Sequence, residues 1–300
     1  MGGELRLEGI IPAVITPFTQ KYEIDEDGYR ETLRFLMAQG VRGLMCAGST
    51  GEGATLTREE RKGLISTTVE EAKSRVPVIA GTGAPSTNET VIYTRDAKDA
   101  GADAALVVSP FYVIPNNVGL IDHYRELTKR VDLPIIVYNI PAHTGTNVDS
   151  QMLVKLSRLR NIVGIKDSSG NMSQFTEEIR VAGAKMAILT GCDDLLYPSF
   201  TLGAPGAIVA IGNIAPKEAV AIYEAVRKGD HEEARRLHYQ VLPVARAIGV
   251  ASNFPAVVKE IVQQLGRPAG PARKPSVPLS EDESKSIREA LIKSRLLKVS

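Results

Sequence analysis

Between residues 10 and 228, short apolar runs alternate with longer segments in which apolar residues recur at helical spacing. The runs have the length of strands, and the longer segments have the length of amphipathic helices. Nearly continuous apolar strands are typical of a parallel sheet covered by helices. The eight runs are "IIPAVITPF", "GLMCAGS", "VPVIAGTG", "AALVVSPFY", "PIIVYNIP", "IVGIKDSS", "MAILTG" and "GAIVAIGN".

A helix is expected after each of these runs. The expected helices cover residues 27–39, 57–73, 87–100, 118–130, 149–159, 172–182, 195–202 and 216–228. Eight strand–helix units can close into a (β/α)8 barrel. An open doubly wound sheet is the alternative, but the chain has neither a strand followed by GxGxxG nor a Walker lysine loop. The pattern therefore favours an α/β protein with the fold of a (β/α)8 TIM barrel.

After residue 228 the pattern contains helices only. Two are expected at residues 231–248 and 253–265, and a proline-rich connector, "GRPAGPARKPSVP", leads to a last helix that begins near Ser280. This segment is too small to form a core of its own, so it should pack on the barrel. We therefore expect a catalytic barrel at residues 1–228 and an appended C-terminal helical region at residues 229–300.

Composition excludes several classes of partner. The 300 residues are 43% hydrophobic, and 36 Lys and Arg residues nearly balance 35 Asp and Glu residues. No basic block with interleaved aromatic residues is present, so nucleic acid is not an expected partner. The start of the chain does not have the pattern of a signal peptide, and no run approaches about 18 apolar residues. These features predict a cytoplasmic protein that does not bind membranes.

The metal-ligating residue types are scattered. Cys46 and Cys192 are far apart, and the four histidines form no cluster with them. Neither a disulfide framework nor a zinc site is indicated. No metal is expected in the reaction.

Candidate chemistry begins with Lys166, which follows four apolar or small residues in "NIVGIKDSSGN". Active sites of barrels lie at the carboxyl ends of the strands, so this amine should enter a water-poor barrel mouth. Desolvation there should lower the lysine pKa from about 10.4 by about 2 to 3, which makes imine formation with a ketone feasible. The alternative is a structural lysine that pairs with Asp167 or reaches solvent.

Two neighbouring strand ends carry hydroxyl groups that would serve such a reaction. Tyr138 ends the preceding strand, and its phenol can relay the protons that imine and enamine steps require. "GSTGE" offers the hydroxyls of Ser49 and Thr50 and backbone amides suited to a small carboxylate. Taken alone, Tyr138 could be an ordinary buried tyrosine, and "GSTGE" could be only a turn.

The segments "GSTGEGATLT", "YNIPAHTG", "GIKDSSGN" and "GCDD", in that order, closely resemble the family of dihydrodipicolinate synthase and N-acetylneuraminate lyase. The resemblance implies an eight-stranded barrel with a C-terminal helical region and a homotetramer built from tight dimers. It also implies a Schiff base with pyruvate or another 2-oxo acid, an aldehyde acceptor, and no metal or organic cofactor.

The resemblance assigns roles to individual residues. Lys166 resembles the Schiff-base lysine, Tyr138 the proton shuttle, and Ser49 stands where the synthases usually have a proton-relaying threonine. The remaining catalytic candidate is Tyr112 in "SPFY", which matches a tyrosine that enters the neighbouring subunit's site. The expected substrate-binding residues are Thr50 and Gly51 for the carboxylate, Ile208 through its carbonyl group, His143, and Ser168.

Two departures from the synthase pattern bear on the acceptor. His143 stands where synthases have an arginine that binds the carboxylate of aspartate semialdehyde, and "KDSSG" replaces "KEA(T/S)G". Both favour a pyruvate-dependent class I aldolase that acts on a 4-hydroxy-2-oxo or 2-keto-3-deoxy acid. The alternatives are dihydrodipicolinate synthase in lysine biosynthesis, a 2-keto-3-deoxy acid dehydratase or deaminase, and a non-catalytic barrel that binds a sugar acid.

Overall fold

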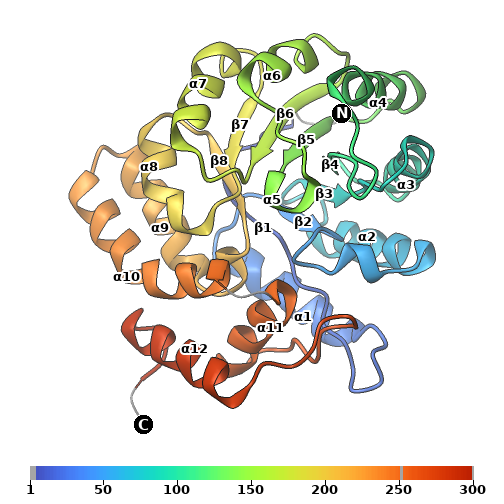
Figure 1. Cartoon of the computed structure of the whole chain (residues 1–300). Coiled ribbons are helices and arrows are strands. Elements are labelled where there is room, and N and C mark those ends of the chain that lie inside the picture. Colours follow the sequence, from blue (N-terminus) through green and yellow to red (C-terminus); the bar gives the residue numbers. More distant parts are fainter. Residues whose placement is uncertain (1–4, 251–252, 299–300) are drawn as a thin grey trace.

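Eight parallel strands form a nearly closed barrel at the centre of the protein (Figure 1). The computed structural model describes residues 5–250 and 253–298. The strands pair in the order β1-β8-β7-β6-β5-β4-β3-β2, and a bridge between Ala13 and Met45 joins β1 to β2. The strands are β1 (Gly9–Pro12), β2 (Leu44–Cys46), β3 (Val78–Gly81), β4 (Ala104–Val108), β5 (Ile135–Asn139), β6 (Ile162–Asp167), β7 (Ala187–Thr190) and β8 (Gly206–Val209).

Helices surround this sheet, and the expected (β/α)8 barrel is confirmed. Those that follow the strands are α1 (Glu26–Ala38), α2 (Arg58–Ala72), α3 (Thr87–Asp99), α4 (Asn117–Arg130), α6 (Ser150–Leu156), α7 (Met172–Ala182), α8 (Leu196–Thr201) and α9 (Pro216–Arg227). Short polar residues begin many of them: Asp25 accepts a hydrogen bond from the amide of Gly28, and Thr57 forms a capping box with Glu60. Such caps satisfy amides that have no partner within the helix.

Two details differ from the sequence prediction. The run "IIPAVITPF" provides only three residues of β1, Ile10–Pro12, and the strand begins one residue earlier, at Gly9. Pro12 ends the strand, and it has no amide hydrogen to donate to a neighbouring strand. A short helix, α5 (Pro141–Thr144), follows β5, although the sequence analysis expected no helix there. Proline is favoured at the first position of a helix, and Pro141 takes that position in α5.

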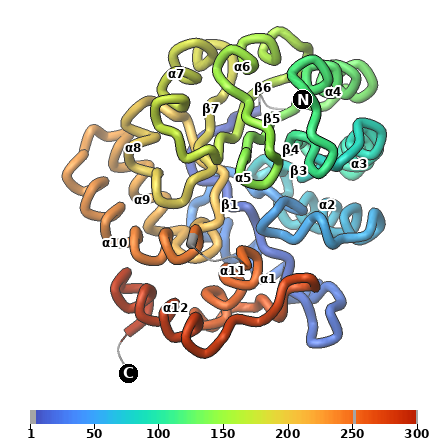
Figure 2. Tube along the Cα trace, in the orientation of Figure 1, coloured from blue at the N-terminus to red at the C-terminus, as the bar shows by residue number. Residues whose placement is uncertain are grey.

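The C-terminal helical region consists of α10 (His231–Val250), α11 (Phe254–Gln264) and α12 (Glu281–Lys293). Figures 1 and 2 show it in orange and red along one side of the barrel, where α10 packs against α9. Val241, Val258 and Leu291 belong to the same buried cluster as the outer faces of the strands. The expected packing on the barrel is therefore observed, while the domain boundary at residue 228 stays a prediction.

A second, smaller cluster fills the inside of the barrel. Its side chains come from successive strands and include Ile11, Met45, Ile79, Ile136 and Leu189. The barrel is thus packed below its mouth, and the polar strand ends lie above this apolar plug. Within the described residues, no helix is long and apolar enough to cross a membrane.

Candidate active site

Lys166 and Tyr138 lie side by side at the mouth of the barrel. They are partners in the register of the parallel strands β5 and β6, so their side chains project toward the same face. The amine Nζ of Lys166 lies 4.2 Å from the centroid of the Tyr138 ring, and both residues are 6% exposed. The predicted juxtaposition of a buried amine and a phenol is therefore observed.

Gly191, at the end of β7, provides the space that the Lys166 side chain occupies. A Cβ atom at Gly191 would lie 2.6 Å from Cε of Lys166 and 2.1 Å from Oγ of Ser168. Carbon atoms do not approach so closely, so any larger residue would displace the lysine. Glycine here is a requirement of the site rather than of the backbone.

Lys166 does not pair with the adjacent Asp167. Successive residues of a strand point to opposite faces, and Asp167 accepts hydrogen bonds from Asn139 Nδ2 at 2.7 Å and Ser169 Oγ at 2.7 Å. Burial raises the pKa of Asp167. In the described part of the chain, Lys166 makes no ion pair within 4.0 Å. Of the structural alternatives for Lys166, the pair with Asp167 is therefore not observed.

Asp193, in the 3-10 turn η2 (Asp193–Leu195), is a carboxylate on the cavity wall that interacts with the charge of this amine. Its Oδ1 accepts a hydrogen bond from the amide of Ile211 at 2.7 Å. Burial raises the pKa of Asp193 to about 6, while the amide of Ile211 and the charge of Lys166 act in the opposite direction. In the sequence, "GCDD" follows a predicted strand, so its position pointed to a carboxylate at the barrel mouth. Asp193 was nevertheless not among the predicted site residues.

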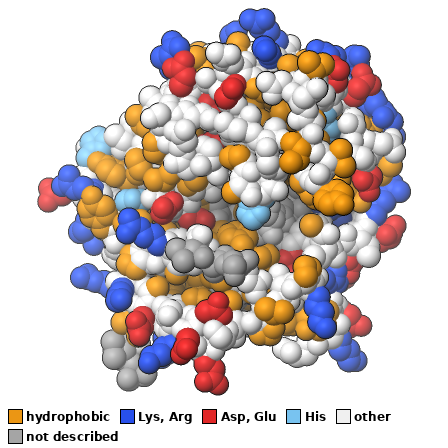
Figure 3. Space-filling view, viewed as in Figure 1, with side chains coloured by type: hydrophobic (Ala, Val, Ile, Leu, Met, Phe, Trp, Pro, Cys, Tyr) orange, Lys and Arg blue, Asp and Glu red, His pale blue; other side chains and the backbone are white. Residues whose placement is uncertain are grey.

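The segment "GSTGE" forms the loop after β2 and continues into the 3-10 turn η1 (Gly53–Thr55). Ser49 is exposed and Thr50 is 3% exposed, and both line a cavity of about 870 Å³ that also contains Lys166 and Tyr138. Thr16 Oγ1 donates a hydrogen bond to the carbonyl of Gly51 at 2.7 Å. Figure 3 shows the hollow in this face of the protein.

Two further side chains with ring or guanidinium nitrogens, those of His143 and Arg246, border the same cavity. His143 lies on α5 and is exposed, and Arg246 reaches the cavity from α10 in the C-terminal region. Arg246 was missed by the sequence analysis, because no motif marks which side of a C-terminal helix faces the barrel. The cavity wall also includes Ser168, whose buried Oγ has no hydrogen-bond partner among the described residues.

Three other predicted site residues do not line this cavity. Ile208 is buried inside the barrel, and Ala210, two residues later, is the one on the cavity wall. Gly51 is not among the residues that line the cavity, and a Cβ atom at this position would lie 2.8 Å from the carbonyl oxygen of Val14. Tyr112 is 94% exposed, at a φ of +69°, and is not among the residues that line the cavity of its own chain. Of these three, only Tyr112 was expected to serve another subunit.

No group of three or more His, Cys, Asp and Glu residues that could hold a metal ion occurs within residues 5–250 and 253–298. The two cysteines are separate: Cys46 is buried in β2, and Cys192 lies on the cavity wall. Burial raises the pKa of the Cys192 thiol to about 12. It is therefore not a reactive thiolate at neutral pH.

Comparison with known proteins places this geometry in a family. The model of the Dihydrodipicolinate synthetase family matches residues 6–294. The chain is 42% identical over 288 residues to a 4-hydroxy-tetrahydrodipicolinate synthase of Methanoculleus marisnigri, which covers 95% of this chain and 98% of that protein. A second such synthase, from Methanospirillum hungatei, is 41% identical with the same coverage.

Solved structures agree with this result. The chloride-inhibited dihydrodipicolinate synthase from Acinetobacter baumannii, in complex with pyruvate, superimposes with a TM-score of 0.94 at 34% identity. The superposition covers 97% of this chain and all of that chain. The resemblance predicted from four short motifs thus extends over nearly the whole fold.

Proposed function

The chain belongs to the dihydrodipicolinate synthetase family of lyases, and we propose that its Lys166 forms a Schiff base with pyruvate. The observation that supports this role is the buried amine beside the Tyr138 ring, with no carboxylate bonded to it in the described residues. An amine without an ionic partner in a water-poor site is available as a nucleophile.

The proposed reaction proceeds through an enamine. The Lys166 amine attacks the ketone carbon of pyruvate, and loss of one water molecule gives the imine. Removal of a proton from the methyl group then gives the enamine, whose carbon attacks the aldehyde carbon of the acceptor. Tyr138 is placed to relay protons at these steps, and Ser49 lies on the same cavity wall. Hydrolysis of the product imine restores the lysine.

The loop Ser49–Thr50 would hold the carboxylate of pyruvate. Its hydroxyls and backbone amides lie on the cavity wall across from the lysine strand. A carboxylate that accepts several such hydrogen bonds is fixed in orientation, so that its ketone faces the amine. Ser168, with an unpartnered buried hydroxyl, is a further candidate contact.

For the acceptor, the names of the relatives favour aspartate semialdehyde over the sugar-acid substrates that His143 suggested. We therefore propose the synthase reaction first. Its acceptor carries a carboxylate, and Arg246 offers a cation on the cavity wall that could replace the missing arginine at position 143. Aldolase action on a 4-hydroxy-2-oxo or 2-keto-3-deoxy acid is the second candidate, because a histidine can bond the hydroxyls of such substrates.

The test is a comparison of kcat/KM values for three reactions. These are condensation of pyruvate with aspartate semialdehyde, cleavage of 2-keto-3-deoxygluconate, and cleavage of 4-hydroxy-2-oxoglutarate. A semialdehyde value more than tenfold above the others supports the synthase, and the reverse order supports the aldolase. In the first case, Arg246→Met should lower kcat/KM for the semialdehyde about ten- to a hundredfold, since a charge-assisted hydrogen bond is lost. Its KM for pyruvate should not change.

We also propose that a second copy of the chain covers the loop that carries Tyr112. Tyr112, Val113 and Ile114 are 94%, 66% and 60% exposed, and exposed apolar residues in one short segment are typical of an interface. A homotetramer in the cytoplasm is the expected assembly and location. Mixing the inactive variants Lys166→Ala and Tyr112→Phe should restore activity if Tyr112 completes the partner's site. Mixed oligomers without activity would contradict this role.

A further inference from the structure

A buried ion pair joins the loop after β2 to the C-terminal helical region. Nζ of Lys259, on α11, lies 2.5 Å from Oε1 of Glu52, and these residues are 1% and 4% exposed. Lys259 also donates to the carbonyl of Pro271 at 2.9 Å, and the amide of Arg273 donates to Oε2 of Glu52 at 2.7 Å. Glu52 stands two residues after Thr50 and also lines the cavity, so the pair lies beside the proposed carboxylate-binding loop.

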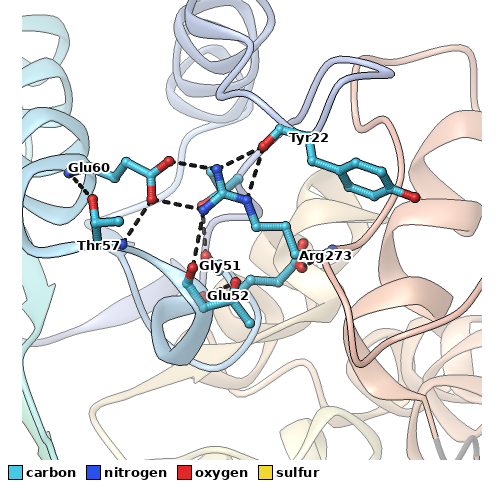
Figure 4. A network of polar contacts seen from close by, with 8 residues as sticks. Tyr22, Gly51, Glu52, Thr57, Glu60 and Arg273 are labelled. Carbon is cyan, nitrogen blue, oxygen red and sulfur yellow. Dashed lines mark hydrogen bonds and ion pairs between the residues drawn. The ribbon is translucent and has the colours of Figure 1, made fainter.

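The guanidinium group of Arg273 extends this network to the far end of the loop (Figure 4). It donates to the carbonyl of Thr55 at 3.1 Å and to both oxygens of Glu60 at 2.6 and 2.8 Å. It also donates to the carbonyl of Tyr22 at 2.8 Å. Hydrogen bonding from Arg273 lowers the pKa of Glu60 to about 2. The connector before α12 is therefore bonded to both ends of the segment from residue 52 to residue 60.

The loop itself has a backbone that needs external support. Ala47 and Glu52 have φ values of 54° and 55°, in the left-handed region that residues other than glycine rarely adopt. Such conformations cost about 1 to 3 kcal/mol each and persist only where surrounding contacts enforce them. Arg61 supports this backbone by donating hydrogen bonds to the carbonyl of Ala47, before Ser49 and Thr50, and to the carbonyl of Gly53, after them.

Glu52 supports the turn that contains Thr50 and Gly51. Its amide donates to the carbonyl of Ser49 at 3.1 Å, which closes a turn over Thr50 and Gly51. The direction of the Glu52 side chain is fixed by Lys259 and Arg273, and this fixes the turn that presents the Ser49 and Thr50 groups to the cavity. A well-packed apolar pair would stabilise an interface equally well, so a buried ion pair is better explained by the single geometry that it enforces.

We propose that Glu52, Lys259 and Arg273 are positioning residues for the loop that binds the carboxylate of the 2-oxo acid. The C-terminal helical region is then a working part of the active site, although it lies outside the barrel strands. This inference rests on the proposed function of the Ser49–Thr50 loop. It predicts that loss of the Glu52 charge weakens pyruvate binding more than it slows the reaction of bound pyruvate.

The test compares two variants that each remove a paired carboxylate. Glu52→Gln should raise the KM for pyruvate at least about tenfold, while kcat at saturating pyruvate changes less than about threefold. Glu71→Gln is the matched control, because Glu71 is also buried and paired, with Arg34 at 2.7 Å and Arg30 at 3.0 Å, but bridges α1 and α2 away from the cavity. It should lose stability without a change in KM. Equal KM values for the two variants would overturn the proposal.

Two further measurements keep the outcome decisive. If Glu52→Gln does not fold, Lys259→Arg retains the charge and should keep the KM for pyruvate within about threefold, whereas Glu52→Asp, with a shorter side chain, should raise it. Hydrogen exchange of the amides of residues 48–53 gives a readout without catalysis: exchange should increase in Glu52→Gln and not in Glu71→Gln. Absence of borohydride labelling in the wild-type protein would overturn the Schiff base, while unchanged exchange in Glu52→Gln would overturn the positioning role.

Discussion

Two lysines are buried in the described part of this protein, and their surroundings are opposite. Both amines lie over an aromatic ring, Lys166 at 4.2 Å from the centroid of Tyr138 and Lys259 at 4.0 Å from that of Phe18. Lys259 is bonded to a carboxylate and a carbonyl, whereas the described residues around Lys166 supply neither. Burial alone therefore does not identify a nucleophile, and the difference lies in the acceptors that surround the amine.

The electrostatics of the two regions follow from these partners. Burial lowers the pKa of Lys259 to about 8, and the charge and hydrogen bond of Glu52 act against that shift. An ammonium group with two acceptors can remain charged and hold a loop in place. At the barrel mouth, the nearby Asp193 has a pKa raised to about 6 by burial and makes its hydrogen bond to a backbone amide instead.

The largest effect should come from removing the unpaired amine. Lys166→Ala should lower turnover at least about 10⁴-fold, since no other group can form the covalent intermediate. The free energy of unfolding should change by less than about 1 kcal/mol, because the lost polar group was not stabilised by a partner. Steady-state kinetics and urea unfolding measure the two quantities.

Borohydride trapping with pyruvate provides the direct comparison of the two lysines. The label should appear on the peptide that contains Lys166 and be absent from the peptide that contains Lys259. A label on Lys259, or a label that persists in Lys166→Ala, would contradict the assignment of Lys166 as the nucleophile.

Removing the paired amine should affect stability instead. Lys259→Met should reduce the free energy of unfolding by about 3 to 5 kcal/mol, because it leaves the carboxylate of Glu52 buried without its cation. The double variant Lys259→Met/Glu52→Gln should recover at least about half of this loss, because no buried charge remains. Urea unfolding of the wild type, the single variant and the double variant measures these free energies. A loss below about 1 kcal/mol in the single variant would mean that water replaces the lysine.

A smaller effect is expected from crowding the unpaired lysine. Gly191→Ala would place a Cβ atom 2.6 Å from Cε of Lys166, so the amine must shift. Displacement of a reacting group costs about ten- to a hundredfold in kcat/KM. Gly63→Ala is the control and should keep full activity, because the added Cβ on α2 would meet nothing within 4 Å apart from its chain neighbours and the backbone of its own helix. Unchanged kinetics in Gly191→Ala would show that the lysine position is not critical.

Most of the fold could be predicted from the sequence, because each unit repeats the same local pattern. The expected helix at 172–182 has the bounds of α7, and the cap expected near Ser280 begins α12. Strand ends were predicted less well, since pairing depends on neighbours as well as on hydrophobicity. In β1 the apolar run continues beyond the last residue of the strand, Pro12.

The candidate site was predictable where it depends on consecutive strands. Lys166 and Tyr138 end neighbouring strands in the sequence, and neighbouring strands pair in a barrel, so their contact follows from the pattern. Contacts between Glu52 and Lys259 or Arg273 join residues more than 200 positions apart without any periodic signal. Arg246 is a similar case. The contribution of the C-terminal region to the cavity therefore required the structure.

The smallest expected effect concerns the face of β6 opposite to Lys166. Glu178, on α7, is 0% exposed, and its Oε1 accepts a hydrogen bond from Gln174 at 2.9 Å. Burial, and secondly the charge of Asp167, raises the pKa of Glu178 to about 8. The carboxyl group is therefore protonated at pH 7 and adds no anion behind the strand that carries the unpaired lysine.

The sign of the pH dependence follows from this raised pKa. Between pH 4.5 and about pH 8 the folded protein retains a proton on Glu178 that the unfolded chain releases, so stability falls as pH rises through this window. Glu178→Gln cannot release a proton, and its stability relative to the wild type should increase by about 2 kcal/mol between pH 5 and pH 7. The control is Glu177→Gln, because Glu177 is only half-buried, pairs with Arg180, and has a lowered pKa. It should show no such slope. If urea unfolding shows that the stability difference between Glu178→Gln and the wild type is also independent of pH, then Glu178 is ionised in the folded protein. An anion would then lie behind the strand that carries Lys166.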